Sequence, residues 1–273
     1  MEPGGDLGPH AAAETTETFG GDVLVSADGP IGRVTLNRPQ VRNALSGAML
    51  SELLEAVRSL IEDRRIRVIV LTGAGSAFCA GDDLREAASA SPREFAEVLE
   101  RMQTLTGMLV AAPKPVVVAV NGPALGGGLE LTLAADVRIA ARSATFGCPE
   151  VGLGLVMTNG ASLLLPRVVG AGRAAEMALT GRIYDADWAL SAGLVGAVVP
   201  DGDLAAHATE VAELIAARDP LALELTRDLL RRPVAAPLPA ALEAESTACM
   251  TAYGSGEARL RLGAFLARGK ERR

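Results

Sequence analysis

Two glutamates, Glu130 and Glu150, stand almost alone among apolar residues. Glu130 is the only charged residue between Pro115 and Ala135, and Glu150 is the only one between Ser143 and Pro166. Burying a carboxylate is costly unless it is ion-paired, hydrogen-bonded or protonated. Two acids held in a dry pocket can take opposite protonation states, one acting as base and the other as acid. The sequence therefore predicts proton-transfer chemistry, and the alternative is that each acid pairs with a distant arginine.

Two backbone amides are candidates for binding a negatively charged oxygen. The segment "SAFCAGDDL", residues 76–84, turns at Gly81 and can present the N–H of Asp82 toward a ligand. Gly127, in the run "GGG" before a predicted helix, can present a second N–H, and a side chain at this position would keep a ligand away from the backbone. Two such donors aimed at one oxygen form an oxyanion hole, in which each donor contributes about 3 to 4 kcal/mol.

Nucleotide binding is a poorer interpretation of the same glycines. A Walker motif needs Lys and Ser or Thr after its last glycine, whereas Leu129 and Glu130 follow here. The segment "GAGSAF" at residues 73–78 has Phe78 where a dinucleotide fingerprint has its third glycine. Neither phosphate-binding motif is therefore present.

The composition also argues against histidine- or metal-based catalysis and against several kinds of partner. His10 and His207 are the only histidines, which argues against a Ser-His-Asp triad or a zinc site, and we predict no metal. Three cysteines without ligand spacing, Cys79, Cys148 and Cys249, fit a reducing compartment and are interpreted as small core residues. With no signal peptide or membrane span in evidence, we expect a cytoplasmic location and no membrane partner. A net charge of −7 and 3% aromatic residues argue against nucleic acid as a partner.

The elements that must position these residues form an α/β pattern. Residues 1–21 lack periodicity and are predicted to be a flexible tail, so we expect the fold to begin near Asp22. Residues 46–63 place apolar side chains at helical spacing, and Asp185 can cap a helix over the segment that follows it. Short β-branched runs closed by Gly, Pro or Asn predict strands within residues 22–27, 32–39, 66–75, 115–122 and 136–143.

The C-terminal part of the chain changes to helices. Residues 203–219 are amphipathic, and the segment from residue 237 to the C-terminus is predicted to hold two more helices. We place a domain boundary near residue 200, which leaves a core of residues 22–200 with the active site and a helical region of residues 201–273.

Five segments in order resemble the crotonase superfamily, that is, the enoyl-CoA hydratase and isomerase family, over about Val23 to Phe265. They are "LNRPQVRNAL", "VIVLTGAGSAFCAGDDL", "KPVVVAVNGPALGGGLELTLAADVRIA", "ATFGCPEVGLG" and "ALTGRIYDADWALSAGLVGAVVP". The resemblance implies a crotonase-like spiral of ββα units and C-terminal helices that mediate trimer formation, often as a dimer of trimers.

The resemblance also implies a reaction. The oxyanion donors would be the N–H groups of Asp82 and Gly127, and the substrate would be a trans-2-enoyl-CoA thioester. Glu130 would activate water as the base, and Glu150, starting protonated, would deliver a proton to the α carbon. No metal or redox cofactor is implied, because coenzyme A is part of the acyl-CoA substrate.

Contacts to coenzyme A follow from the same resemblance. Arg42 matches a place where a basic residue meets the pyrophosphate, and Arg268, after Phe265, resembles a basic residue that reaches coenzyme A on a neighbouring subunit. For both arginines the alternative is an ordinary solvated charge. Further predicted binding residues lie in the segment that resembles the adenine-binding loop and beside the glutamates: Ala80, Gly81, Asp83, Leu84, Gly126 and Thr158.

One segment departs from the family pattern. Met157, Thr158 and Asn159 replace the usual small residues after Glu150. Thr158 and Asn159 could cap the next helix, or contact a polar substrate or the water. The departure leaves open another crotonase reaction, such as double-bond isomerisation, hydrolysis or decarboxylation of an acyl thioester, as well as a non-catalytic binding role. The acyl chain length is not indicated by the sequence.

Overall fold

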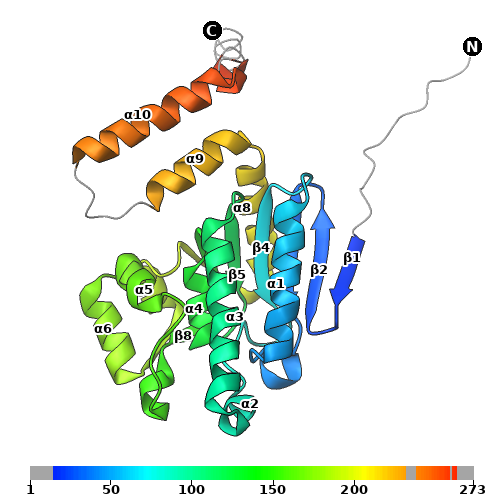
Figure 1. The fold of residues 1–273 in the computed structure, drawn as a ribbon, viewed down its shortest axis with the longest axis vertical. Coiled ribbons are helices and arrows are strands. Elements are labelled where there is room, and N and C mark those ends of the chain that lie inside the picture. The colour runs from blue at the N-terminus through cyan, green and yellow to red at the C-terminus, as the bar shows by residue number, and fades with distance from the viewer. Residues whose placement is uncertain (1–14, 232–237, 259, 263–273) are drawn as a thin grey trace, which may run out of the picture.

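The computed structural model describes residues 15–231, 238–258 and 260–262, and its strands form two sheets (Figure 1). The large sheet has the order β1-β2-β3-β4-β5-β7-β10, with β1 to β3 antiparallel and β3 to β10 parallel. Its strands are β1 (Thr15–Phe19), β2 (Val23–Asp28), β3 (Ile31–Leu36), β4 (Val68–Gly73), β5 (Val116–Val120), β7 (Val137–Ala141) and β10 (Ala197–Val199). The small sheet joins β6 (Ala124–Leu125), β8 (Thr145–Gly147) and β9 (Ile183–Asp185). The predicted α/β class is confirmed, and all five predicted strands are present.

Helices connect and cover these strands. The α-helices are α1 (Gly47–Glu62), α2 (Leu84–Ser89), α3 (Pro92–Ala111), α4 (Gly127–Leu133), α5 (Ala161–Val169), α6 (Ala171–Thr180), α7 (Ala186–Ser191), α8 (Leu204–Ala216), α9 (Pro220–Leu230) and α10 (Leu238–Gly254). Short 3-10 helices are η1 (Pro39–Val41), η2 (Pro149–Leu153) and η3 (Asp201–Asp203). Within the described ranges, no helix is long and apolar enough to cross a membrane.

Helices α1 and α3 lie side by side on one face of the large sheet (Figure 1). Ser46 caps α1, because its side chain accepts a hydrogen bond from the Met49 N–H, and the helix predicted over residues 46–63 is confirmed. At the other end, Lys114 Nζ donates to the carbonyls of Leu60 and Asp63 at 2.6 Å. The apolar stripe of α1 is buried against the sheet in the larger of two core clusters.

Helix α8 covers the opposite face of the sheet. Its buried side chains Leu204, Ala208, Ala212 and Ala216 form a second core cluster with residues of β4, β5 and β7. Strand β5 is buried along its whole length because helices cover both faces, which explains its unbroken run "VVVAV". The boundary predicted at residue 200 therefore precedes a helix that completes the core.

The start of the fold differs from the prediction. Residues 15–19, which were assigned to a flexible tail ending at residue 21, form the edge strand β1 and pair with β2. The segment "TTETF" is rich in β-branched threonine, and an antiparallel partner was available in β2. Only residues 1–14 of the predicted tail lie outside the described part of the chain.

Helices α9 and α10 lie at one end of the molecule, beyond the strands (Figure 1). Helix α9, which was not predicted, is fixed to the sheet by a buried ion pair between Arg227 Nε and Asp136 Oδ2 at 2.6 Å. Arg231 Nη2 binds the other carboxylate oxygen at 2.8 Å. Helix α10 confirms one of the two helices predicted after residue 237, and residues 263–273 lie outside the described part of the chain.

Candidate active site

The segment from Cys79 to Asp83 is fixed between two other parts of the backbone. On one side, Cys79 exchanges hydrogen bonds with Pro123 and Leu125, each at 3.0 Å. On the other side, the Leu45 N–H donates to the Gly81 carbonyl at 2.8 Å, and the Asp83 N–H donates to the Leu45 carbonyl at 3.0 Å. Gly81 has φ +94°, and a Cβ there would lie 2.8 Å from the Leu125 carbonyl oxygen. Glycine is therefore required at this turn.

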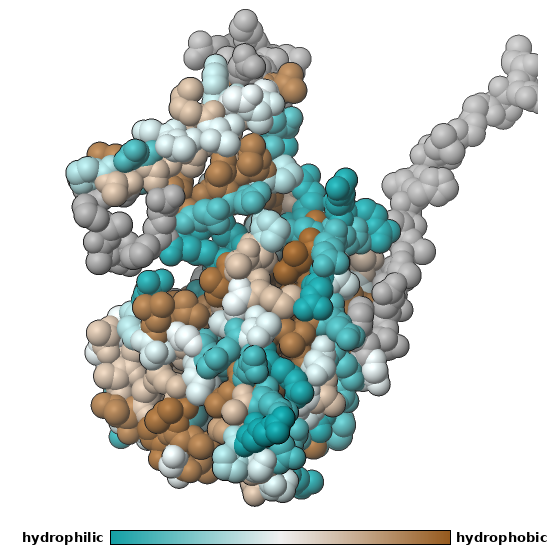
Figure 2. All heavy atoms as spheres, in the orientation of Figure 1, coloured by the Kyte–Doolittle hydropathy of each residue, from teal (hydrophilic) through white to brown (hydrophobic). Residues whose placement is uncertain are grey.

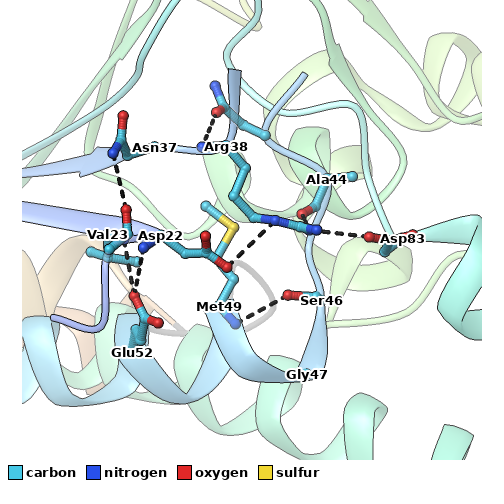
Figure 3. Close-up of polar contacts among 12 residues, drawn as sticks. Asp22, Val23, Asn37, Arg38, Ala44, Ser46, Gly47, Met49, Glu52 and Asp83 are labelled. Carbon is cyan, nitrogen blue, oxygen red and sulfur yellow. Dashed lines mark hydrogen bonds and ion pairs between the residues drawn. The ribbon is translucent and has the colours of Figure 1, made fainter. Parts of the chain in front are cut away.

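Arg38 supports this segment from the neighbouring loop (Figure 3). Its Nη1 donates to the Ala44 carbonyl at 2.6 Å and pairs with Asp83 Oδ2 at 3.1 Å, while its Nε lies 3.4 Å from Asp22 Oδ2. Asn43 is fully buried and accepts a hydrogen bond from the Arg38 N–H at 2.8 Å. These contacts join the start of the fold, the loop before α1 and the segment that carries Asp82.

The backbone N–H groups of Asp82 and Gly127 have no hydrogen-bond acceptor among the described residues. Gly127 is the first residue of α4, so its N–H has no acceptor within the helix, and Asp82 lies on the fixed segment. A Cβ on Gly127 would lie 2.7 Å from both Asp82 Oδ1 and Met102 Cε, which shows how closely the two amide-bearing residues approach.

Glu130, on the first turn of α4, is buried with 2% of its surface exposed. Its Oε1 accepts a hydrogen bond from the Thr158 N–H at 2.5 Å. Its Oε2 accepts from Thr158 Oγ1 at 3.1 Å and from Asn159 Nδ2 at 2.6 Å. Burial raises the pKa of Glu130, and the hydrogen bonds from Thr158 and Asn159 oppose that rise. The carboxylate is therefore held by donors and not by an arginine.

Glu150 lies on η2 and has different surroundings. Both of its carboxyl oxygens are buried without a hydrogen-bond partner, and a Cβ on Gly126 would lie 3.2 Å from Oε1. Burial raises the pKa of Glu150, a contact with its own backbone N–H opposes that rise, and repulsion by Asp82 adds to it. No ion pair of the described residues includes either glutamate, so this part of the chain gives no support to the ion-pair alternative.

The side chain of Asp82 is a third acid that the sequence analysis did not identify. Its Oδ1 is buried without a partner, and burial, together with repulsion by Glu130, raises the pKa of Asp82 to about 6. The available signal was the pair Asp82-Asp83, two adjacent acids in a loop from which only the backbone was expected to act. Asp83 is paired with Arg38, whereas the Asp82 carboxyl turns inward.

A cavity of about 170 Å³ brings most of the predicted residues together. Glu130, Glu150, Asp82 and Gly127 all line it, as do other predicted residues: Ala80, Gly81, Leu84, Gly126 and Thr158. Its remaining wall is mostly apolar, with Phe95, Leu99, Leu153, Leu155 and Val156. Three acids, Glu130, Glu150 and Asp82, therefore line one largely apolar cavity together with Gly127, and free amides in such a cavity can stabilise an enolate while protons move.

The other predicted contacts fall elsewhere. Arg42, which is exposed with φ +54°, lines a neighbouring surface cavity of about 590 Å³ together with Arg38, Asp83 and Arg85. Phe265 and Arg268 lie outside the described residues. Of the alternatives given for Thr158 and Asn159, capping of the next helix is wrong, because α5 has Gly160 as its N-cap and both side chains bind Glu130.

Known proteins that resemble this chain in sequence and in structure come from one family. The sequence profile of the enoyl-CoA hydratase/isomerase family matches residues 27–271. The chain is 34% identical over 257 residues to the short-chain-enoyl-CoA hydratase of Clostridium acetobutylicum, covering 91% of this chain and 96% of that protein. It is 39% identical over 207 residues to the mitochondrial enoyl-CoA hydratase domain-containing protein 2 of Bos taurus, covering 74% of this chain and 70% of that protein. The crystal structure of an enoyl-CoA hydratase from Bacillus anthracis superposes with a TM-score of 0.81 at 39% identity, covering 84% of this chain and 90% of that one.

Proposed function

The chain belongs to the enoyl-CoA hydratase/isomerase family and has the crotonase fold, and on that premise we propose that it is an enoyl-CoA hydratase. The proposed reaction is syn addition of water to a trans-2-enoyl-CoA, which gives a 3-hydroxyacyl-CoA. The observation that supports it most strongly is the unequal pair of acids. Glu130 accepts three hydrogen bonds and Glu150 accepts none, while both line the cavity that contains the Asp82 and Gly127 amides.

Each group has one role in the proposed reaction. The thioester oxygen accepts hydrogen bonds from the N–H groups of Asp82 and Gly127. Glu130 removes a proton from water as the water oxygen bonds to the β carbon, and the electrons of the double bond move onto the thioester as an enolate. The enolate then takes a proton from Glu150 at the α carbon. Transfer of the proton from Glu130 back to Glu150 restores the starting state.

The cavity of about 590 Å³ beside the active site is the proposed place for the coenzyme A part of the substrate. Arg38, Arg42 and Arg85 lie on its wall and supply positive charge for phosphate groups. Ala80, Asp83 and Leu84 also line this cavity, and Ala80 and Leu84 border the reacting cavity as well, so the segment 80–84 connects the two. Arg42, Ala80, Asp83 and Leu84 therefore remain proposed coenzyme A contacts.

Hydration of crotonyl-CoA tests the proposal. We expect the wild-type protein to remove the conjugated enoyl absorbance, and we expect Glu130→Gln and Glu150→Gln each to lower kcat by about 10²- to 10⁴-fold. Glu210→Gln on α8, which lies on the opposite face of the sheet, is the matched control and should keep the wild-type rate.

Three outcomes would contradict the hydratase proposal. Wild-type hydration that survives either glutamate substitution within twofold would remove the two acids from the mechanism. Double-bond migration that persists in the Glu130→Gln variant alone would indicate an isomerase that uses Glu150. A wild-type protein without turnover on any acyl thioester would indicate a non-catalytic binding role.

We also propose that the chain assembles as a homotrimer or a dimer of trimers through its helical C-terminal region. Large apolar side chains are exposed on the C-terminal helices α9 and α10, among them Leu230 at 81%, Leu242 at 52% and Met250 at 67%. Others are exposed on α5 and α6, where Figure 2 shows hydrophobic surface. Such a surface is typical of an interface. Sedimentation velocity should give three or six times the chain mass, and a single species at 28.0 kDa would refute the assembly. A cytoplasmic location remains part of the proposal, because the structure leaves Cys79, Cys148 and Cys249 as free thiols.

A further inference from the structure

The loop before α5 places three hydrogen-bond donors on one carboxylate. Thr158 supplies its backbone N–H and its hydroxyl, and Asn159 supplies its side-chain amide, so that both oxygens of Glu130 are engaged. These two residues belong to the segment in which the sequence departs from the family pattern. A glycine or alanine in their place would leave at most the backbone N–H.

We propose that Thr158 and Asn159 are positioning residues that keep Glu130 ionised and oriented, and thereby assign the base role to Glu130 and the acid role to Glu150. This inference rests on the proposed hydration. It differs from the expectation that Thr158 contacts the substrate, because both donors of Thr158 are already used by Glu130.

The charges around Glu130 show why donors are needed. The titratable groups that face it are Asp82 on the segment before α2, Cys148 at the end of β8 and Glu150 on η2. All three are neutral or negative, so repulsion and burial both favour protonation of Glu130. A carboxylate that accepts hydrogen bonds is stabilised in its charged form. The three donors from Thr158 and Asn159 therefore stabilise the charged form of Glu130, and Glu150 has no such donors from other residues.

The donors also determine which oxygen is free to act. Each carboxylate oxygen has about two lone-pair positions. Oε2 of Glu130 fills both, with Thr158 Oγ1 and Asn159 Nδ2, whereas Oε1 accepts only the Thr158 N–H. A water molecule that gives up a proton to Glu130 therefore binds at Oε1.

The conformation and burial of Asn159 indicate that this residue has a functional role. It has φ +49°, the left-handed region that non-glycine residues rarely adopt, and only 4% of its surface is exposed. Its Oδ1 is buried without a hydrogen-bond partner. Asparagine tolerates this conformation better than other non-glycine residues, but a buried carbonyl oxygen without a partner opposes folding, so stability alone does not explain an asparagine here. Its one hydrogen-bonded side-chain atom is the amide nitrogen on Glu130.

Three substitutions test the side-chain donors one at a time. Thr158→Val removes the hydroxyl while keeping the side-chain shape and the backbone N–H, whereas Thr158→Ser keeps the hydroxyl. Asn159→Gly removes the amide at a position where glycine accepts the positive φ. Thr104→Val is the matched control, because the Thr104 hydroxyl bonds only to the Glu100 carbonyl on the exposed face of α3.

The first readout is the pH profile of kcat for hydration. The low-pH limb reports protonation of the base, so we expect Thr158→Val and Asn159→Gly to move that limb upward by about one pH unit each. Thr158→Ser should return it to the wild-type position, and Thr104→Val should leave it unchanged. A rate that falls without movement of the limb would overturn the proposal, since a structural defect lowers the rate at every pH.

The second readout does not depend on activity. Carboxyl ¹³C NMR of the glutamate-labelled protein, with Glu130→Gln to assign the signal, follows the titration of Glu130 directly. An upward movement of its midpoint in both variants supports the proposal even if the wild-type protein hydrates no substrate, in which case only the proposed hydration fails. Midpoints equal to that of the wild type, in variants with wild-type circular dichroism, would overturn it.

Discussion

Replacement of Asp82 by asparagine should stabilise the protein in a pH-dependent way. The unfolded chain ionises this carboxyl near its ordinary pKa of 3.8, whereas burial and repulsion by Glu130 raise its folded pKa to about 6. The folded form therefore opposes ionisation, and the difference corresponds to about 3 kcal/mol of stability that the wild-type protein lacks once the pH exceeds the folded pKa. Asparagine has a similar shape, keeps the backbone N–H and carries no charge.

The sign of the effect follows from the two pKa values. Above pH 6 the variant should be more stable by the full amount of about 3 kcal/mol, and at pH 5 by about half of that, because the folded carboxyl is then largely protonated. Below pH 3.8 the carboxyl is protonated in both states and the advantage disappears.

Urea unfolding at pH 5 and pH 8, at one protein concentration, measures the difference in the free energy of unfolding between Asp82→Asn and wild type. Asp28→Asn on the exposed end of β2 is the matched control for loss of one surface carboxylate. An Asp82→Asn advantage of the same size at both pH values, or no advantage at pH 8, would show that the carboxyl is not held in a dry, repulsive site.

Two other predictions concern the scaffold. Gly128→Ala should lower the free energy of unfolding by at least about 2 kcal/mol, because the new Cβ would overlap the Cys79 carbonyl oxygen, whereas Gly107→Ala, with open space around it, should raise it by about 0.5 to 1 kcal/mol. Equal effects of the two substitutions in urea unfolding would contradict the close packing of α4. Asp136→Asn should cost about 3 to 5 kcal/mol, because Arg227 would stay buried without its counter-charge. If Asp136→Asn left the melting temperature unchanged, the ion pair with Arg227 would not stabilise the fold.

Much of the fold could be predicted because it depends on local periodicity. The helix over residues 46–63 and the strands within residues 66–75 and 115–122 were identified from apolar spacing, which burial against the sheet imposes directly on the sequence. Helix α9 was missed although its local signals are in the sequence: Asp219 caps it by accepting a hydrogen bond from the Ala222 N–H, and Pro220 stands in its first turn. What the sequence could not show is the pairing of Arg227 with Asp136, 91 residues earlier, because a long-range contact leaves no periodic signal.

The sequence predicted some residues of the candidate site but not the contacts between them. Glu130 and Glu150 were recognisable because a lone acid in an apolar run needs an explanation. The partners of Glu130 were not, because Thr158 and Asn159 reach it only through a loop that contains a left-handed asparagine. The inward turn of the Asp82 carboxyl was equally hidden, since a residue chosen for its backbone N–H can direct its side chain to either side of the loop.

The backbone hydrogen bonds on both sides of the Cys79–Asp83 segment also affect the thermodynamics of ligand binding. The entropic cost of ordering this segment is met when the chain folds, so the Asp82 amide, which we propose binds the thioester oxygen, is oriented before a substrate enters. In the proposed reaction, preorganisation of this kind favours compounds that resemble the enolate over the ground-state thioester, because rigid dipoles discriminate by charge without rearranging. A rigid loop can thus make a binding site selective for short-lived intermediates.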